Sequence, residues 1–390
     1  MKFFTFRNIL FVIAYLLPVA VIGQTSTDGS TFRGSRVEVP FLNITPDSRS
    51  GAMGEAGVAL SPDVNASFWN PSKLAFIESN DALSLSYSPW LRHLVPDISL
   101  SYLSYAHKID DRNTLGASLR YFNYGSLQLT DDNTNDQGTY TPNEFSLDVS
   151  YARKFGENFS LGLTARYIHS SISSVSFATA GSNQTGRAGN AFAADVSMFY
   201  KAPYGDNNLF AFGANISNIG SKISYSDNGP KYFLPANLKF GVANTWNLDE
   251  SNQITLAFDI NKQLTPSPPV RDADGVIISG KNDDVSVPAG IFQSFGDAPG
   301  GFKEELKEYS LSPGAEYWYN NQFAIRAGYL YENPNKSDRR YVTLGFGVKY
   351  DVFQFDFSYL AASQQNSPLA NTLRFTLSAN FGGTSNVSKR

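Results

Sequence analysis

The 390-residue sequence contains no cysteine, so it holds no disulfide framework, no thiolate metal site and no cysteine nucleophile. Beyond its N-terminal leader it has no apolar run of about 18 residues, which excludes helical membrane spans there. Histidine is scarce, and the three present, His93, His107 and His169, do not have the spacing of metal ligands. The net charge is −4, and removing Lys2 and Arg7 with the leader brings it to −6. This acidic balance argues against a nucleic-acid partner.

The leader, residues 1–23, has the composition of a secretory signal peptide. A basic n-region precedes an apolar stretch of about 14 residues, and Val21 and Gly23 are small residues at the spacing of a signal-peptidase site. The mature chain would then begin at Gln24. A single transmembrane anchor is the alternative, but spanning requires about 20 apolar residues.

From about residue 80 the sequence consists of short stretches in which apolar residues alternate with small or polar ones. In residues 145–152, for example, Phe, Leu, Val and Tyr alternate with Ser, Asp, Ser and Ala. This period of two indicates strands that are apolar on one face only. Fourteen such strands are predicted, at 82–89, 97–108, 114–125, 143–155, 158–171, 190–202, 209–218, 235–248, 252–263, 309–319, 321–332, 339–350, 352–361 and 371–381.

The gaps between these strands also follow a pattern. Six are short turns, rich in Asn, Asp and Gly, and five of those six are flanked by aromatic residues, as in an interfacial girdle. The longer gaps, 126–142, 172–189, 219–234, 264–308 and 362–370, have the composition of surface loops. An even number of amphipathic strands with short turns at one end and long loops at the other is typical of an outer-membrane barrel.

We therefore predict an all-β fold, a 14-stranded antiparallel transmembrane β-barrel over residues 81–381. A closed barrel leaves no unpaired backbone edge, so it can lie in lipid where an open sheet cannot. The apolar face would contact membrane lipid and lipopolysaccharide, and the short turns would face the periplasm. Residues 382–390 would form a small periplasmic tail.

Residues 24–80 do not alternate and carry a different pattern. Gly51, Gly54 and Gly57 follow one another at intervals of three, which is also found in phosphate-binding loops. No strand precedes them and no P-loop lysine follows, so close packing of backbone against a wall is favoured instead. A barrel of fourteen strands is too wide to be filled by its own side chains. We therefore predict that residues 24–80 form a lumenal hatch.

A hatch inside a barrel would need partners for its charges, because an unpaired buried charge is costly. Asp47, Arg49 and Asp63 are expected to pair with lumen-facing charges of the wall, such as Arg120, Asp148 and Arg166.

The longest gap, residues 264–308, holds five prolines and the aromatics Phe292, Phe295 and Phe302. Residues 302–307 have the composition of a short helix. The segment is either a mobile surface loop or an ordered element that binds a partner, and long loops of this kind are often functional. The three phenylalanines are the candidate partner-binding residues.

The strand count together with the N-terminal motif resembles a known family. Asp47, Arg49, the three glycines, Asp63 and Trp69-Asn70-Pro71 resemble the N-terminal segment of FadL-like barrels, the superfamily of long-chain fatty-acid transporters. Within it they are most similar to the PorV-type barrels of the type IX secretion system.

The resemblance implies a shuttle of the bacterial outer membrane. Such barrels collect secreted cargo proteins by their C-terminal signal domains at the translocon and deliver them to the attachment complex at the cell surface. No cofactor is implied.

Three other functions each require features that can be sought in the sequence. An enzyme is disfavoured, because a nucleophilic serine or aspartate needs an activating partner. His169 is followed by Ser170 and Ser171, but neighbours on a strand point to opposite faces. A FadL-like transporter of hydrophobic small molecules would need an apolar lumenal pocket and a gap in the wall, for which Pro313-Gly314 is the candidate. A general porin is opposed by the predicted hatch.

Overall fold

The computed structural model describes residues 34, 36–90, 97–130, 135–174, 176–179, 182–227, 229–337, 339–362 and 372–382. The predicted signal peptide, residues 383–390 of the predicted tail and His93 lie outside these residues.

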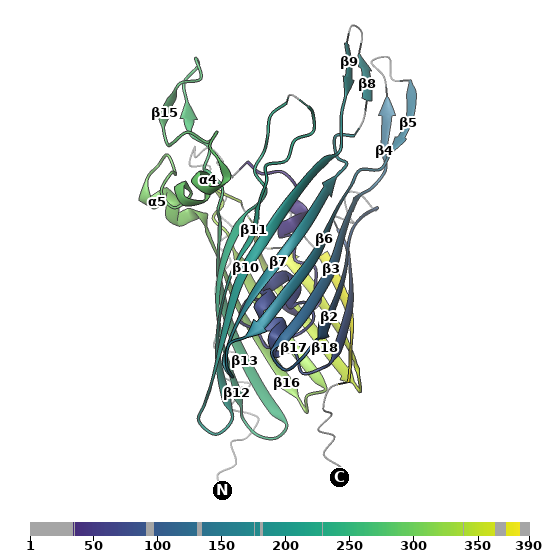
Figure 1. The fold of residues 1–390 in the computed structure, drawn as a ribbon, viewed down its shortest axis with the longest axis vertical. Coiled ribbons are helices and arrows are strands. Elements are labelled where there is room, and N and C mark those ends of the chain that lie inside the picture. Colours follow the sequence, from purple (N-terminus) through teal and green to yellow (C-terminus); the bar gives the residue numbers. More distant parts are fainter. Residues whose placement is uncertain are drawn as a thin grey trace.

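Fourteen strands form one closed antiparallel barrel, in which the last strand pairs with the first (Figure 1). The prediction of an all-β, 14-stranded barrel is confirmed, and each predicted strand end lies within two residues of the observed one. The barrel strands are β1 (Asp81–Pro89), β2 (Ile98–Lys108), β3 (Asn113–Tyr124), β6 (Asn143–Lys154), β7 (Phe159–Ser170), β10 (Gly189–Tyr204), β11 (Asn208–Gly220), β12 (Asn237–Asn247), β13 (Asn252–Gln263), β16 (Tyr309–Tyr319), β17 (Phe323–Tyr331), β18 (Arg340–Tyr350), β19 (Phe353–Ala362) and β20 (Thr372–Phe381).

The two faces of the barrel wall differ as the alternation predicted. In β6, Leu147 and Val149 are exposed on the outer face, whereas Ser146 and Ser150 are buried on the inner face. None of the helices in the described part of the chain is long and apolar enough to cross a membrane.

The short turns are built from residues that tolerate a left-handed backbone. Asn320 and Asn321 between β16 and β17 have φ of 51° and 52°, and Asp351 between β18 and β19 has φ of 52°. Such positive φ values favour Asn, Asp and Gly. The aromatics beside these turns are exposed on the outer surface, among them Phe155, Tyr200, Phe210, Tyr319, Phe323 and Tyr350.

Three short hairpins in the long loops were not predicted. They are β4 (Leu127–Thr130) with β5 (Asp136–Tyr140), β8 (Ser176–Thr179) with β9 (Ser182–Thr185), and β14 (Val270–Arg271) with β15 (Ile277–Ser279). They extend beyond the barrel at the long-loop end (Figure 1). β4 alternates over only four residues, Leu127 to Thr130, and β5 is polar throughout except for Tyr140, so neither carries an apolar alternation long enough to predict a strand.

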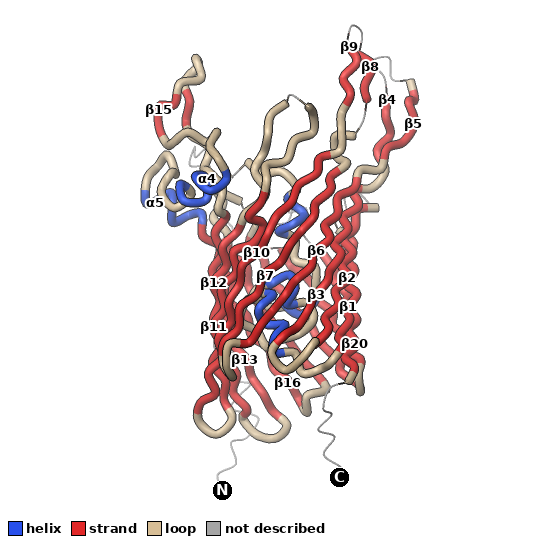
Figure 2. The backbone as a smooth tube through the Cα atoms, viewed as in Figure 1, coloured by secondary structure: helices blue, strands red, loops and turns tan. Residues whose placement is uncertain are grey.

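The N-terminal segment, defined here as residues 36–80, lies inside the barrel. It forms four short helical turns, η1 (Pro40–Asn43), α2 (Ser48–Gly51), α3 (Ala66–Trp69) and η2 (Pro71–Phe76), which are enclosed by the strands (Figure 2). Helices this short are not stable by themselves. They depend on contacts with the wall, and nearly all of residues 44–77 are buried.

The wall has a local interruption at Pro313, where the sequence suggested one. Pro313 lies opposite Phe258 of β13, but on the β17 side the pairing passes from Leu311 directly to Gly314, which pairs with Gly328. Proline has no N–H to donate to that side.

The backbone of the N-terminal segment covers this interruption. A Cβ placed on Gly328 would lie 2.0 Å from the Gly54 nitrogen, and one on Gly314 would lie 2.4 Å from the Met53 oxygen. The two wall glycines therefore allow the backbone of residues 53–54 to lie directly on the wall.

We expect Gly328→Ala to displace the N-terminal segment, because the added methyl group would overlap backbone that cannot move aside. Forced overpacking typically costs about 1–3 kcal/mol. Limited proteolysis of the purified protein in detergent should show residues 41–77 becoming susceptible to cleavage. Gly296→Ala is the control, since a Cβ there meets no atom within 4 Å. Equal protease resistance of the two variants would contradict the packing argument.

Candidate functional site

The lumen of the barrel is held together around Trp69 and Asp47. The indole of Trp69 is 1% exposed, and its Nε1 donates a hydrogen bond of 2.6 Å to Oδ1 of Asp47. The other oxygen of Asp47 accepts from the Ser50 backbone at 2.9 Å and so caps α2. Burial raises the pKa of Asp47. Gly57 lies against the indole, since a Cβ there would be 2.3 Å from Trp69 Cδ2.

Arg49 joins the N-terminal segment to the wall. Its guanidinium donates to both oxygens of Glu316 on β16, at 3.0 and 2.8 Å, and to Asp63 at 2.9 Å. Burial alone would lower the pKa of Arg49, but the carboxylates of Glu316 and Asp63 raise it above its usual value. Glu316 is also bound by Arg326 of β17 at 2.6 Å, and Arg326 in turn binds Asp356 of β19 at 2.7 Å.

The expected pairing of Arg49 with a lumen-facing charge of the wall is confirmed, but the partner is Glu316. The three wall residues named as examples, Arg120, Asp148 and Arg166, were wrong. Asp148 lies between Arg166, at 2.7 Å, and Arg120, at 3.6 Å, and Arg166 also binds Asp195 at 2.9 Å, so these wall charges compensate one another. Only Arg120 reaches the N-terminal segment, where it donates to the Leu42 carbonyl at 2.5 Å. Neighbouring strands place these opposite charges closer to one another than to the charges of the segment. The wall residues therefore form ion pairs among themselves.

The wall also holds the segment through its backbone. Asp259 of β13 accepts hydrogen bonds from the N–H groups of Gly57 and Val58, at 2.7 and 2.9 Å. Asn70 donates to the carbonyls of Val58 and Met198, at 3.0 and 2.9 Å, so its amide bridges segment and wall.

Lys73 is fully buried without a carboxylate partner among the described residues. Its Nζ donates to the Gly57 carbonyl at 2.6 Å, and burial lowers its pKa to about 8. Lys73 lies within η2, which begins at Pro71, where the missing N–H is not needed.

The remaining glycines of the motif are also in close contact. A Cβ on Gly54 would lie 2.5 Å from the Tyr329 backbone, and Gly54 has φ of 69°. A Cβ on Gly51 would lie 3.1 Å from Arg374 Nη1. A side chain would therefore not fit at Gly54 and Gly57, and the contact at Gly51 is tight. The role of the segment as a hatch stays a prediction.

The loop of residues 264–308 is an ordered element at the long-loop end. It contains the β14–β15 hairpin, α4 (Val287–Gln293), α5 (Phe302–Glu305) and η3 (Leu306–Glu308), which lie beside the rim of the barrel (Figure 1). The predicted helix at 302–307 is confirmed. The three candidate phenylalanines are exposed, Phe292 to 79%, Phe302 to 76% and Phe295 to 47%.

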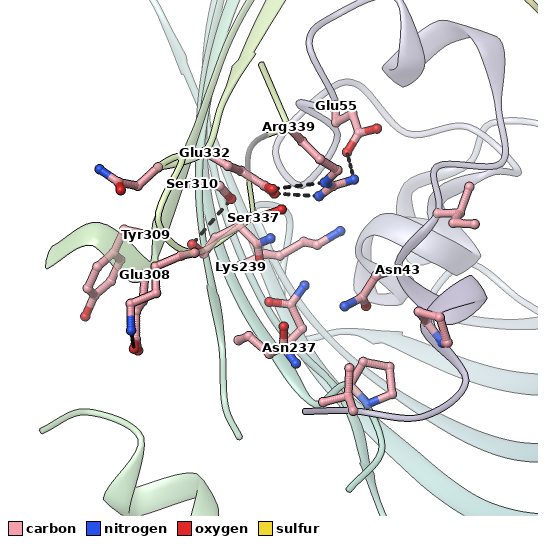
Figure 3. Close-up of a pocket in the computed structure, with 18 of the residues that line it drawn as sticks. Asn43, Glu55, Asn237, Lys239, Glu308, Tyr309, Ser310, Glu332, Ser337 and Arg339 are labelled. Carbon is pink, nitrogen blue, oxygen red and sulfur yellow. Dashed lines mark hydrogen bonds and ion pairs between the residues drawn. The ribbon is translucent and has the colours of Figure 1, made fainter. Parts of the chain in front are cut away.

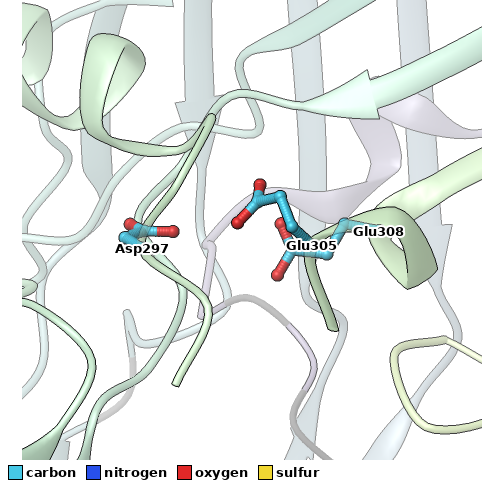
Figure 4. Close-up of side chains that lie close together, drawn as sticks. All are labelled: Asp297, Glu305 and Glu308. Atoms are coloured by element: carbon cyan, nitrogen blue, oxygen red, sulfur yellow. The ribbon is translucent and has the colours of Figure 1, made fainter. Parts of the chain in front are cut away.

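A cluster of charges fastens this loop to the wall. The carboxylates of Asp297, Glu305 and Glu308 gather within 4.8 Å of one another (Figure 4). Lys262 of β13 binds Glu305 at 2.7 Å and Glu308 at 2.8 Å, and Lys336 binds Glu308 at 2.8 Å. Burial raises the pKa of Asp297 and would also raise that of Glu308, but the two lysines hold the pKa of Glu308 below its usual range.

The two described histidines lie on the outer surface. His107 Nδ1 is 2.8 Å from Asp81, and His169 Nδ1 is 2.9 Å from Asn190. His169 also stacks on Phe145, with ring centroids 5.0 Å apart. Both are partnered residues of the barrel exterior.

Comparison with known proteins decides the family. The family model of the type IX secretion system protein PorV matches residues 30–270. The chain belongs to the PorV family. No curated protein sequence matches it.

Solved structures with a similar fold are transport barrels. The Pseudomonas putida toluene transporter TodX is 13% identical, with a TM-score of 0.51, and the match covers 86% of this chain and 98% of TodX. The CymD monoaromatic hydrocarbon channel is 12% identical, with a TM-score of 0.50 over 86% of this chain and 97% of CymD. At these identities the similarity concerns the fold alone.

The PorV-type barrel is therefore an integral protein of the bacterial outer membrane and a component of the type IX secretion system. PorV-type and FadL-like barrels are secretion and transport proteins rather than enzymes in kind. In barrels of this class the short turns face the periplasm and the long loops face outward.

Two residues that position the segment, Glu316 and Asp259, were not identified from the sequence. Each is one polar residue among others on the lumenal face of a strand. The alternation predicts that they face the lumen, but it carries no signal for the partner that each one meets.

We expect Arg49→Met to destabilise the protein strongly, because it leaves Glu316 with one of its two cations. Breaking a buried ion pair typically costs about 3–5 kcal/mol. In a double-mutant cycle with Glu316→Gln, measured by urea unfolding in detergent micelles, the double variant should lose less than the two single variants together. Arg112→Met, in an exposed turn, is the control. If the losses of unfolding free energy in the two single variants simply add up in the double variant, the pairing of Arg49 with Glu316 is contradicted.

Proposed function

We propose that this protein is the shuttle of the type IX secretion system. It binds the C-terminal signal domain of secreted proteins at the translocon and carries them to the attachment complex at the cell surface. Membership of the PorV family supports this role, and the loop of residues 264–308 is the observation that carries it.

The loop has the features of a protein-binding element. Phe292 and Phe302 project from α4 and α5 into solvent, and neither packs on the barrel rim. The ion pairs of Lys262 and the bond from the Ser267 backbone to Asp297, 3.1 Å, hold the loop in place. Aromatic side chains on a pre-ordered loop lose little entropy on binding and can act as anchors of an interface.

The filled lumen fits a protein that works on its outer surface. Arg49, Trp69 and Asn70 connect the N-terminal segment to itself and to the wall, so the segment acts as a hatch that closes the barrel. We infer that neither solutes nor cargo pass through the lumen.

A FadL-like transporter of hydrophobic small molecules is the second candidate. The interruption beside Pro313 favours it, since such transport needs an opening in the wall. The backbone of residues 53–54 covers that interruption. The cavity at the outward end of the lumen is lined largely by charged and amide side chains, which do not suit a hydrocarbon.

Deleting residues 40–76 should open the lumen or prevent assembly, because the wall loses its filling and Glu316 and Asp259 lose their partners. Single-channel recording in planar bilayers should show conductance for any assembled barrel of the variant and none for the parent. Deleting residues 128–139, within the β4–β5 hairpin, is the control. An assembled variant that stays non-conducting would contradict a hatch.

Replacing Phe292 and Phe302 together by serine should reduce attachment of secreted cargo to the cell surface. Loss of two interface anchors costs about 2 kcal/mol or more each, so cargo should accumulate unattached or in the periplasm. Surface labelling and cell fractionation measure this. The control is Leu127→Ser, an exposed apolar residue of another outward loop.

The barrel of the double variant should remain heat-modifiable in the outer membrane. Normal attachment of cargo combined with lost uptake of a hydrophobic compound would reject the shuttle and support the transporter.

A further inference from the structure

A cavity lies at the outward end of the lumen. It has a volume of about 300 Å³ and opens between the N-terminal segment and the ends of β12, β13, β16 and β17 (Figure 3). The loop that follows β17 and the end of the 264–308 loop form its rim. A volume of this size is at the lower end of the range for ligand sites, so it suits the last residues of a chain and not a folded domain.

Lys239 reaches into this cavity from the wall without a carboxylate partner. Its Nζ makes no hydrogen bond and no ion pair with any described residue. It lies 4.5 Å from the ring centroid of Trp69 and 5.0 Å from that of Phe68. The aromatic rings hold the ammonium in position and leave its three N–H donors free for a ligand.

Amide groups surround Lys239. Asn261 is its cross-strand partner on β13, and Asn237 lies two residues before it on the same lumenal face of β12. The side-chain oxygens of Asn237 and Asn261 are both buried and without a hydrogen-bond partner, and Asn237 is only 2% exposed. Asn43 lies across the cavity from Asn237 (Figure 3). Buried amides without partners are costly unless a ligand or water completes them.

The summed charge of the side chains that line the cavity matches a ligand with one negative charge. Four cationic and three anionic side chains line the cavity, a net charge of +1. Arg339 is engaged by Glu332 at 2.5 Å and lies 3.6 Å from Glu55, and Lys336 is engaged by Glu308. One carboxylate on Lys239 brings the summed charge of the lining to zero. Lys307 is the other lining cation for which the described residues provide no ion pair, and it lies on the rim at the end of the 264–308 loop.

We propose that this cavity binds the free carboxylate at the end of a polypeptide chain, with Lys239 as its ionic partner and Asn237 and Asn261 on the neighbouring backbone. Each Asn side chain can both donate and accept a hydrogen bond, so it can pair with the C=O and N–H groups of a peptide backbone. The inference rests on the proposed function, and it names the chain terminus of the cargo as the group recognised inside the barrel mouth. A small organic acid also carries a carboxylate. The experiment must therefore distinguish binding of a peptide C-terminus from binding of a small acid.

The probe is a fluorescein-labelled Gly-Ser-Gly-Ala peptide, prepared as free acid and as C-terminal amide. Binding to the full-length mature protein in lipid nanodiscs is followed by fluorescence polarisation. The free acid should bind at least about tenfold more tightly than the amide, as expected for a charge-assisted hydrogen bond.

Variants connect this difference to Lys239. Lys239→Gln should lower the affinity of the free acid to that of the amide, and Lys239→Arg should restore most of it. Lys349→Gln removes the same charge at the opposite end of the barrel and should leave binding unchanged. Heat-modifiability reports whether each variant is folded, and the comparison of acid with amide on the parent protein needs no variant.

Three outcomes would overturn the inference. One is equal binding of acid and amide, and another is free-acid binding that survives Lys239→Gln. The third is displacement of the peptide by propionate as effectively as by unlabelled peptide, which would assign the site to small acids.

The inference can fail separately from the shuttle. Loss of peptide recognition with cargo attachment intact rejects the carboxylate site alone. Normal attachment after substitution of Phe292 and Phe302, combined with lost uptake of a hydrophobic compound, rejects the shuttle itself.

Discussion

The carboxylate of Glu316 is the point on which the interior of this barrel depends. It receives Arg49 from the N-terminal segment and Arg326 from the wall, and Asp356 completes the series. A wide barrel must put polar side chains on its inner face, and charges buried there require partners. Arg49 supplies one of those partners. The segment that fills the lumen therefore also compensates the buried negative charge of Glu316 on the wall.

Close packing of backbone is the second constraint. Gly54 meets the Tyr329 backbone, and Gly328 meets Gly54, so neither surface could carry a side chain. This contact lies where Pro313 interrupts the pairing of β16 with β17. The segment is thereby seated where the pairing of β16 with β17 is interrupted, so its backbone covers that part of the wall.

At the outward end of the protein, ion pairs hold the long loop in place, while some of its aromatic side chains stay exposed to solvent. Lys262 and Lys336 fix the long loop by its carboxylates, while Phe292 and Phe302 remain in solvent. Inside the rim, the ammonium of Lys239 lies over the Trp69 ring, and the buried Oδ1 of Asn237 has no hydrogen-bond partner. Surfaces of this kind are pre-organised, so binding there costs little entropy.

The sequence by itself determined the fourteen strands, their ends and their turns, because alternation and turn residues act over a few positions. It also indicated close backbone packing at Gly51, Gly54 and Gly57, since the absence of a side chain is visible in the sequence, whereas Trp69 and Asn70 were singled out by the family resemblance. Only the tertiary structure decided the partners. Arg49 and Glu316 are 267 positions apart, and the wall charges first expected to meet Arg49 are satisfied by neighbouring strands. Barrel register and the seating of the segment choose among chemically equivalent carboxylates, and that choice has no local sequence signal.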